Sequence, residues 1–370
     1  MKNTKMNLNA LFSFLVISIL FSSCSSPKNS ETGEARVRQV VDTVGFAHLS
    51  WQMDSVLYRI NKDFGSELDA VSQSPETAWR AAICPHDDYT YASWLYPAVL
   101  KNVRSKTVII FGVAHRALNF ELEDRIVFDS FDAWQGPKGE VQVSPLRDKI
   151  IQQLPKELYV VHDSMQMIEH SVESMLPFLQ MQNPETEIIS ILVPYMSSAK
   201  MDTIAGQLAT AIKSVTSADQ LVWGKDFSIL ITTDAVHYGD EEWGGSNYAR
   251  FGCDSTGYRQ AVALEHEIIQ NCFTGELTDE QPNRFIGYTV KDDDFRQYKW
   301  TWCGRYSVPL GLKVALKLQQ EENATPLAGV PLAYETSISQ KHIPVDDLDM
   351  GRTAIATPHH WVGYAAVGFK

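Results

Sequence analysis

Short apolar runs rich in β-branched residues alternate along this chain with longer stretches in which apolar residues recur at helical spacing. The short runs have the length and composition of strands that are buried on both faces of a sheet. They lie at 81–83, 108–111, 158–161, 187–193 and 227–231. The helical stretches lie at 46–61, 89–103, 147–153, 169–180, 199–215, 258–272 and 305–319.

This alternation predicts an α/β fold, with a central, mostly parallel or mixed sheet and helices on both of its faces. Two runs near the end of the chain, 332–337 and 363–369, alternate apolar residues with polar or small ones. We expect them to extend the sheet as antiparallel strands.

Polar side chains follow four of the predicted strands at the point where each strand ends. His86 follows the first, His115 the second, Tyr195 the run that ends at residue 193, and Asp234 and His237 the run that ends at residue 231. In open α/β sheets, ligands bind outside the carboxyl ends of the strands. The sequence therefore predicts a functional site at this edge of the sheet.

The first residues of the chain have the layout of a secretion signal. Two lysines precede the apolar run 11–21, and two serines directly precede Cys24. This layout resembles that of bacterial lipoproteins, in which the cysteine is lipidated and becomes the new N-terminus. A membrane-spanning helix is the alternative, but the run is shorter than the ~20 residues that a span needs.

The predicted organisation is a signal peptide at 1–23, a disordered tether at 24–38 and a single α/β domain at 39–370. A lipid on Cys24 would anchor the domain to a membrane on its extracytoplasmic side, facing the periplasm or the outside of the cell. The signal thus predicts an extracytoplasmic, membrane-anchored protein.

Composition narrows the classes of partner. The formal net charge is −13, which argues against a nucleic-acid partner, because such partners require a basic surface. Only four cysteines follow Cys24, too few for a scaffold of disulfides. Hydrophobic residues make up 44% of the chain, enough for a large buried core.

The sequence lacks the G-x-S-x-G, G-x-x-x-x-G-K, C-x-x-C and H-E-x-x-H motifs. What remains at the predicted strand ends is a set of histidines and aspartates, joined by one cysteine farther along. Imidazole is a ligand of iron, zinc and copper, and a thiolate is a softer, strongly donating ligand. Two histidines and one anionic ligand leave coordination positions open for a substrate. On spacing alone, each histidine fits equally well as a hydrogen-bonded residue of a polar crevice.

Five short motifs follow one another in a set order: Pro85-His86-Asp87-Asp88-Tyr89, Gly112-Val113-Ala114-His115, Glu169-His170-Ser171-Val172-Glu173, Asp234-Ala235-Val236-His237 and Thr301-Trp302-Cys303-Gly304-Arg305. Motifs of this kind, in this order, resemble those of the Memo family, which includes the bacterial proteins called AmmeMemoRadiSam system protein B. The resemblance extends from about residue 40 to the C-terminus. It therefore implies one Memo-like domain.

Memo proteins resemble the class III extradiol dioxygenases in fold, and their metal site contains two histidines and a cysteine. By motif position, the resemblance implies that His86, His115 and Cys303 are the metal ligands here. His170, Asp234 and His237 match residues that line the same pocket, so the resemblance implies acid, base or supporting roles for them.

On the predicted helix 169–180, Glu173 lies three residues after His170 and faces the same side. This spacing predicts that the Glu173 carboxylate orients the imidazole of His170.

The chain departs from the usual family pattern next to the first histidine. Asp87 and Asp88 occupy positions where Ala-Gly is usual, which would place two carboxylates beside the metal. Cys84 lies two residues before His86 on an extended segment and so points to the same side. It is an extra ligand, a disulfide partner of Cys303 or a small packed core thiol, and the sequence leaves these three alternatives open.

The resemblance favours a metal-binding lipoprotein that acts as a non-haem, dioxygenase-like oxidoreductase on an unknown small molecule. Fe(II) is the first choice of metal, with copper and zinc as alternatives. Two other functions stay open. One is a protein that binds a metal or ligand without turnover, and the other is a zinc-dependent hydrolase.

Overall fold

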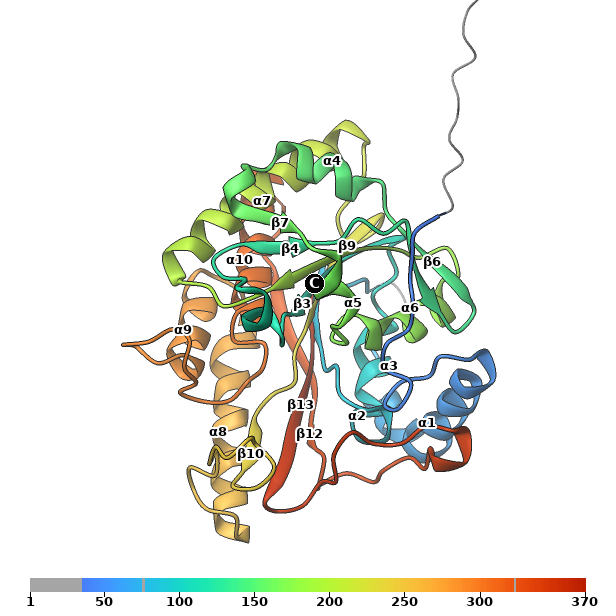
Figure 1. Ribbon diagram of the computed structural model, residues 1–370, viewed down its shortest axis with the longest axis vertical. Helices are drawn as coiled ribbons and strands as arrows, with labels where there is room; N and C mark the ends of the chain where they lie inside the picture. The colour runs from blue at the N-terminus through green and yellow to red at the C-terminus, as the bar shows by residue number, and fades with distance from the viewer. Residues whose placement is uncertain (1–34, 75–76, 323) are drawn as a thin grey trace, which may run out of the picture. The chain divides into compact units, whose positions relative to one another are not determined.

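The predicted strands belong to one mixed sheet (Figure 1). The structure is a computed structural model that describes residues 35–74, 77–322 and 324–370, and within these residues the sheet has 13 strands. The predictions of a signal peptide at 1–23 and of a lipid on Cys24 lie outside the described residues. At the end of the predicted tether 24–38, Val37 and Arg38 form a short strand of this sheet.

The strands are β1 (Val37–Arg38), β2 (Ala81–Cys84), β3 (Thr107–Val113), β4 (Ile126–Phe128), β5 (Ala133–Gly136), β6 (Gly139–Val143), β7 (Tyr159–Val161), β8 (Glu187–Val193), β9 (Phe227–Thr232), β10 (His237–Gly239), β11 (Gly275–Glu276), β12 (Ala328–Thr336) and β13 (His360–Phe369). The α-helices are α1 (Ser50–Ala70), α2 (Tyr89–Ala92), α3 (Leu95–Leu100), α4 (Leu146–Gln153), α5 (Asp163–Met167), α6 (Leu176–Gln182), α7 (Ser198–Ala218), α8 (Ser255–Phe273), α9 (Glu280–Thr289) and α10 (Ser307–Glu322). The 3₁₀ turns are η1 (Ala117–Phe120), η2 (Lys156–Leu158), η3 (Glu173–Met175) and η4 (Asp346–Leu348).

The centre of the sheet is parallel and its C-terminal end is antiparallel. Strands β8, β3, β9 and β2 are neighbours in that order and all pair in parallel. Strand β13 then pairs antiparallel with β2, and β12 pairs antiparallel with β13. The predicted fold class and the predicted antiparallel extension are both confirmed.

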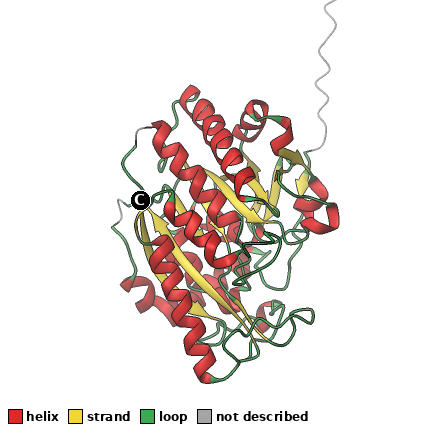
Figure 2. Ribbon diagram, turned by 90° about the vertical axis from the view of Figure 1, so that its left-hand side faces the viewer, coloured by secondary structure: helices red, strands yellow, loops and turns green. Residues whose placement is uncertain are grey.

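Alternate residues of the central strands enter two different hydrophobic cores. In β3, Ile109 and Phe111 pack in a core with residues of α4, α7, α8 and α10, whereas Val108 and Ile110 pack in a core with residues of α1, α2, α3 and α6. Figure 2 shows helices of the first group lying in front of the strands. Helices therefore cover both faces of the sheet, which explains why these strands read as uninterrupted apolar runs.

Two predicted helices are interrupted. The stretch 89–103 forms α2 and α3 because Ser93, with a φ of 22°, breaks the helix between them. The stretch 169–180 is helical only from η3 onward, and α6 has Pro177 in its first turn. Proline is tolerated there, whereas inside a helix that began at residue 169 its ring would clash with the preceding turn. Glu169 and His170 therefore lie in an irregular segment.

Helix α10 packs closely on the centre of the sheet. A Cβ atom on Gly311 would lie 2.6 Å from the side chain of Ile231, so a glycine permits this approach of the helix to β9. Cys303 lies four residues before the start of α10, and this packing brings the cysteine to the carboxyl end of β9.

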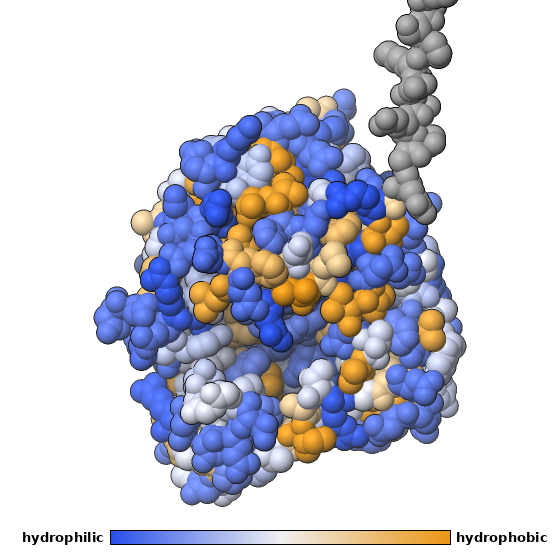
Figure 3. All heavy atoms as spheres, in the orientation of Figure 1, coloured by the Kyte–Doolittle hydropathy of each residue, from blue (hydrophilic) through white to orange (hydrophobic). Residues whose placement is uncertain are grey.

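The face of the molecule drawn in Figure 3 is mostly hydrophilic, with hydrophobic residues in scattered groups. No helix in the described part of the chain is both long and apolar enough to cross a membrane.

Candidate metal centre

Two of the predicted site residues meet because β2 and β9 are adjacent and parallel. Cys84, the last residue of β2, pairs in register with Thr232, the last residue of β9. Two residues farther along, His86 donates its backbone N–H to the Asp234 carboxylate at 2.9 Å. The His86 Nδ1 atom lies 3.0 Å from the Thr232 hydroxyl, so the Nε2 atom is the one that faces the site.

Cys303 arrives from the segment before α10. Trp302 forms an isolated antiparallel β-bridge with Val236, and the Cys303 sulfur accepts the backbone N–H of Asp234 at 3.1 Å. This sulfur lies 3.4 Å from His86 Nε2. The thiol therefore occupies the end of β9 although it is distant in the sequence.

His115 follows β3, the other neighbour of β9. Its backbone N–H donates to Glu169 Oε2 at 2.9 Å, and its Nδ1 atom lies 2.8 Å from Glu169 Oε1. A carboxylate that holds one ring nitrogen fixes the tautomer and the orientation of a histidine, and leaves the other nitrogen free for a metal. Glu169 thus fixes the orientation of His115, which is a candidate metal ligand.

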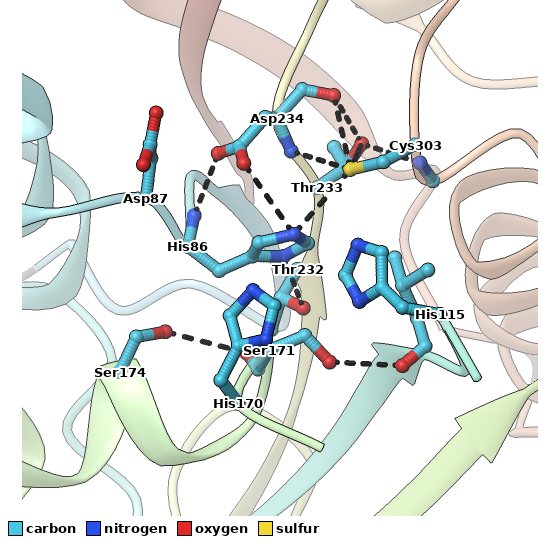
Figure 4. A network of polar contacts seen from close by, with 12 residues as sticks. His86, Asp87, His115, His170, Ser171, Ser174, Thr232, Thr233, Asp234 and Cys303 are labelled. Atoms are coloured by element: carbon cyan, nitrogen blue, oxygen red, sulfur yellow. Dashed lines mark hydrogen bonds and ion pairs between the residues drawn. The ribbon is translucent and has the colours of Figure 1, made fainter. Parts of the chain in front are cut away.

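The donor atoms of His86, His115 and Cys303 all lie within 4.8 Å of one another. Figure 4 shows the two imidazoles and the sulfur facing one another. Metal bonds to imidazole nitrogen and to sulfur are about 2.0–2.3 Å long, so atoms at these separations fit around a single ion. Two imidazoles and a thiol are also a suitable donor set for iron, copper or zinc.

The three predicted acid, base or supporting residues lie around this cluster. The His170 ring stacks on His115 with 4.8 Å between ring centroids and meets His86 edge-on at 5.6 Å. Asp234 and His237 form a second group with Cys303, whose donor atoms are again within 4.8 Å of one another. The buried His237 Nε2 atom has no hydrogen-bond partner among the described residues. An unpartnered imidazole nitrogen beside the thiol is suited to a bound ion or ligand.

A cavity of about 210 Å³ opens beside these residues, and we call it the histidine cavity. Four imidazoles and two carboxylates line it, together with Tyr364, Tyr91 and Trp243; the six groups are those of His115, His170, His237, His360, Asp87 and Asp234. The cavity has room for a small molecule next to the candidate ligands.

Burial controls protonation at the site. Burial lowers the pKa of His86 well below its ordinary value, and the nearby imidazoles of His115, His170 and His237 lower it further. Burial, together with the nearby imidazoles of His115, His360 and His170, lowers the pKa of His237 to about 3. The imidazoles of His86 and His237 are therefore neutral near pH 7, which is the form that binds a metal.

Burial also raises the pKa of the Cys303 thiol well above its ordinary value, and the Asp234 carboxylate raises it further. A metal binds the thiolate, so binding at Cys303 would release a proton.

The prediction that Glu173 orients His170 is wrong. The buried Glu173 carboxylate forms an ion pair with Arg38 and accepts the backbone N–H groups of Val41 and Asp42. The predicted helix through residue 169 is absent, so the assumed i, i+3 geometry does not apply. Glu169, which precedes His170, is the carboxylate at the site.

Only one of the two aspartates after His86 lies at the cavity. Asp87 lines it and accepts the Tyr364 hydroxyl at 2.6 Å, whereas the Asp88 carboxylate accepts the backbone N–H of Thr353 at 2.5 Å. Cys84 is free and packs in the core with α1, α2, α3 and α6, so of the three alternatives it is the packed thiol.

Sequence reasoning missed Glu169 and Glu265 as supporting residues. Glu265, on α8, accepts the indole N–H groups of Trp300 and Trp302 at 2.6 and 2.8 Å, and so holds the segment that carries Cys303. The signal in the sequence was that Glu265, unlike Glu267, lies at helical spacing with the apolar residues Ala261, Ile268 and Ile269. For Glu169, the signal was its place beside His170 in the motif.

The sheet and the donor set define an α/β protein with a candidate metal centre at the carboxyl edge of its parallel strands. Residues 52–341 match the family described as Memo-like protein, and the chain belongs to that family. The resemblance of the five sequence motifs is thereby confirmed.

Relatives include a MEMO1 family protein of Ignicoccus hospitalis that is 29% identical over 309 residues, covering 82% of this chain and 87% of that protein. A MEMO1 family protein of Pyrococcus abyssi is 28% identical over 163 residues, 43% of this chain and 53% of that protein. One of Thermotoga maritima is 28% identical over 164 residues, 43% of this chain and 54% of that protein. The chain thus spans about half the length of the Pyrococcus and Thermotoga relatives.

Proposed function

We propose that His86, His115 and Cys303 hold one transition-metal ion, with Fe(II) as the first choice, and that the protein is a non-haem, dioxygenase-like oxidoreductase. The observation that carries this proposal is the convergence of two imidazoles and a thiol, whose donor atoms lie within 4.8 Å of one another at the end of three parallel strands. The substrate is a small molecule that enters the histidine cavity.

A bound iron ion would supply redox chemistry and open coordination positions for a substrate. The protein's own part is to orient and to move protons. Glu169 fixes His115 through Nδ1, and Thr232 fixes His86 through its own Nδ1. These contacts prepare the two imidazoles before any metal arrives, which lowers the cost of assembling the site.

His170 is suited to exchange a proton with a substrate. Its side chain is 38% exposed, lines the histidine cavity and stacks on His115. Burial lowers its pKa, so near pH 7 the neutral ring offers one donor and one acceptor. His237 offers an unpartnered Nε2 atom to the same space, and the Asp234 carboxylate lies beside His86. The His170 ring is partly exposed to solvent, whereas the Asp234 side chain and the His237 Nε2 atom are buried.

The test is elemental analysis and absorption spectroscopy of the full-length protein purified without oxygen, with Cys303→Ala and the matched control Cys272→Ala. Cys272 is a buried free thiol on α8 that belongs to no candidate metal group among the described residues. We expect about one iron per chain in the wild type and in Cys272→Ala, and loss of iron from Cys303→Ala. Retention of the metal in Cys303→Ala would show that the site is wrong.

Oxygen consumption by the metal-loaded protein with catechol-like substrates then tests turnover. Uptake above that of the Cys303→Ala variant would support the oxidoreductase. Stoichiometric iron or copper without turnover would instead favour a binding protein. Colourless protein with stoichiometric zinc, and hydrolysis that continues without oxygen, would favour a zinc hydrolase, because Cys and two His with an open position are also a zinc site.

We also propose that the protein is lipidated on Cys24 and membrane-anchored on the extracytoplasmic side. The support is the order of charged, apolar and small residues before Cys24. Incorporation of labelled palmitate into the wild type and not into Cys24→Ser would support this, and equal labelling would contradict it.

A further inference from the structure

A second and larger cavity, about 620 Å³ in volume, differs in charge from the rest of this acidic protein. Its wall comes from the segment 291–305, from the loop after β10 and from Tyr195, which follows β8. We call it the basic cavity because five of its thirteen lining residues are Lys or Arg, and none of the described residues in its wall is Asp or Glu. The five are Arg250, Lys291, Arg296, Lys299 and Arg305.

Most of this positive charge is not neutralised within the protein. Arg296 pairs with Glu123 at 2.6 Å and Lys299 pairs with Asp292 at 3.7 Å. For the other three cations, no carboxylate of the described part of the chain lies within the 4.0 Å limit of an ion pair. The cavity therefore presents a local positive field, although the chain carries a net charge of −13.

Arg305 is the most informative of these residues because it is buried and poorly partnered. The residue is 2% exposed, and its Nη2 atom donates to the backbone carbonyl of Arg296 at 2.8 Å. The Nε and Nη1 atoms have no hydrogen-bond partner among the described residues. A buried guanidinium without a carboxylate is costly, and an oxyanion is a ligand whose negative charge and acceptor oxygens can satisfy its free N–H groups.

Aromatic rings surround this guanidinium and the cavity. The Arg305 Cζ atom lies 3.4 Å from the ring centroid of Tyr298, 4.9 Å from that of Tyr306 and 5.5 Å from that of Tyr195. Tyr248 and Trp300 also line the cavity. Rings of this kind stack on flat, apolar parts of a ligand, whereas the cations bind its charged end.

The basic cavity adjoins the candidate metal centre. A narrow space of about 60 Å³ is lined by His115 and Cys303, together with Tyr195, Tyr298 and Arg305. The last three residues also line the basic cavity, so the two spaces share a wall. A ligand held in the basic cavity would therefore lie close to the two metal ligands.

From these observations we infer that the basic cavity is a binding site for a small aromatic oxyanion, with a carboxylate or phosphate group bound near Arg305 and Arg250 and a ring against the tyrosines. The site needs no metal, so it stands or falls independently of the proposed metal centre. A ligand could also reach the metal centre from the basic cavity, by a route separate from the histidine cavity.

The test is isothermal titration calorimetry of the metal-depleted full-length protein with phenylphosphonate at low ionic strength. Phenol and inorganic phosphate, which carry only the ring or only the anion, are titrated in parallel. The variants are Arg305→Gln, Arg305→Lys and Arg250→Gln, with Arg259→Gln as the control. Arg259 is an exposed arginine on α8 that does not line the cavity. Melting temperature and circular dichroism establish that each variant is folded.

We expect saturable binding of phenylphosphonate that weakens with added salt. The affinity should fall about tenfold or more in Arg305→Gln and about fivefold in Arg250→Gln, because hydrogen bonds to charged groups are lost. It should be unchanged in Arg259→Gln. If Arg305→Gln does not fold, Arg305→Lys and Arg250→Gln still decide the question.

Three results would overturn the inference. The first is no saturable binding, or equal affinity in all the variants, since either would mean that the cations do not form a site. The second is binding of phenol as tight as that of phenylphosphonate, which would make the charge irrelevant. The third is binding of inorganic phosphate as tight as that of phenylphosphonate, which would remove the aromatic ring from the ligand class. Loss of metal binding has no bearing on any of the three, because the protein is titrated without metal.

Discussion

The histidine cavity and the basic cavity lie next to the same short segment of chain but have opposite chemistry. The first is lined by four imidazoles and two carboxylates, the second by five cations and no carboxylate of the described residues. Neutral and anionic donors suit a metal cation, whereas unpaired cations suit an oxyanion. Two neighbouring cavities can therefore bind ligands of opposite charge when different side chains line each of them.

The segment 300–303 lies between them, because Thr301 lines the basic cavity and donates its hydroxyl to the backbone carbonyl of His237, which lines the histidine cavity. Trp300 lines the basic cavity, Trp302 is completely buried, and Cys303 faces His86. Glu265 accepts both indole N–H groups and fixes this arrangement. Because positive charge close to a metal ion weakens its binding, a rigid segment between the cations and the ligands benefits the metal centre.

The largest expected effect is a loss of metal binding that leaves anion binding in the basic cavity unchanged. His115→Ala removes one of three proposed ligands, so we expect the affinity for the metal to fall more than about 100-fold, beyond the loss seen for supporting residues. Binding of phenylphosphonate in the basic cavity should stay within about twofold. Metal titration monitored by absorption, and calorimetry for the anion, measure the two effects.

The matched control for this change is His266→Ala, since His266 lies on α8 and belongs to none of the candidate metal groups in the described part of the chain. Equal metal affinity in His115→Ala and His266→Ala would rule out His115 as a ligand. A parallel loss of anion binding would show that the two cavities are one site.

The next effect concerns the segment between the cavities. Burial raises the pKa of Glu265 to about 7 from an ordinary 4.5, so the folded protein holds a proton that the unfolded chain releases between these values. The contribution of protonated Glu265 to the free energy of unfolding is therefore fully present below about pH 4.5. It is lost as the pH rises through 7. The shift corresponds to about 3 kcal/mol at most.

Urea denaturation at pH 5 and pH 8 tests this prediction. The free energy of unfolding should fall more between the two pH values in the wild type than in Glu265→Gln, which cannot titrate at this position. Equal differences in the two proteins would mean that Glu265 keeps an ordinary pKa in the folded state.

Periodicity in the sequence was sufficient for the central sheet but not for the supporting contacts. The runs that became β2, β3, β8 and β9 are buried on both faces, so composition alone identified them and the polar residues that follow them. The interruptions at Ser93 and before Pro177 depend on local backbone geometry, which periodicity does not record.

The same limit applies to the candidate site. Ligand types and strand ends pointed to His86 and His115, whereas Cys303 came from the family resemblance. The choice between Glu169 and Glu173 depended on whether residue 169 begins a helix. Glu265 and Arg305 act through tertiary contacts with residues that are distant in the sequence, and no local pattern announces such contacts.

A smaller effect on metal affinity is expected from substitution of the two glutamates near His170. Glu169→Gln leaves His115 without its charged partner, so we expect metal affinity to fall about 10- to 100-fold. Glu173→Gln breaks a buried ion pair with Arg38 and should lower stability without a comparable loss of metal affinity. Metal titration and thermal melting of both variants measure the two outcomes, and equal losses of metal affinity would contradict the assignment of Glu169.

The smallest expected effect tests how far one additional unpaired cation strengthens anion binding in the basic cavity. Arg296 is held by Glu123 through two hydrogen bonds of 2.6 and 2.7 Å on the surface. Glu123→Gln would release this guanidinium to the cavity and add one more unpaired cation there. Because exposed ion pairs are weak, we expect phenylphosphonate to bind only about twofold tighter. Asp346→Asn, which frees Arg352 away from the cavity, is the control. Weaker binding in Glu123→Gln than in this control would mean that the Glu123 pair holds the cavity in shape, and that order in its wall outweighs its charge.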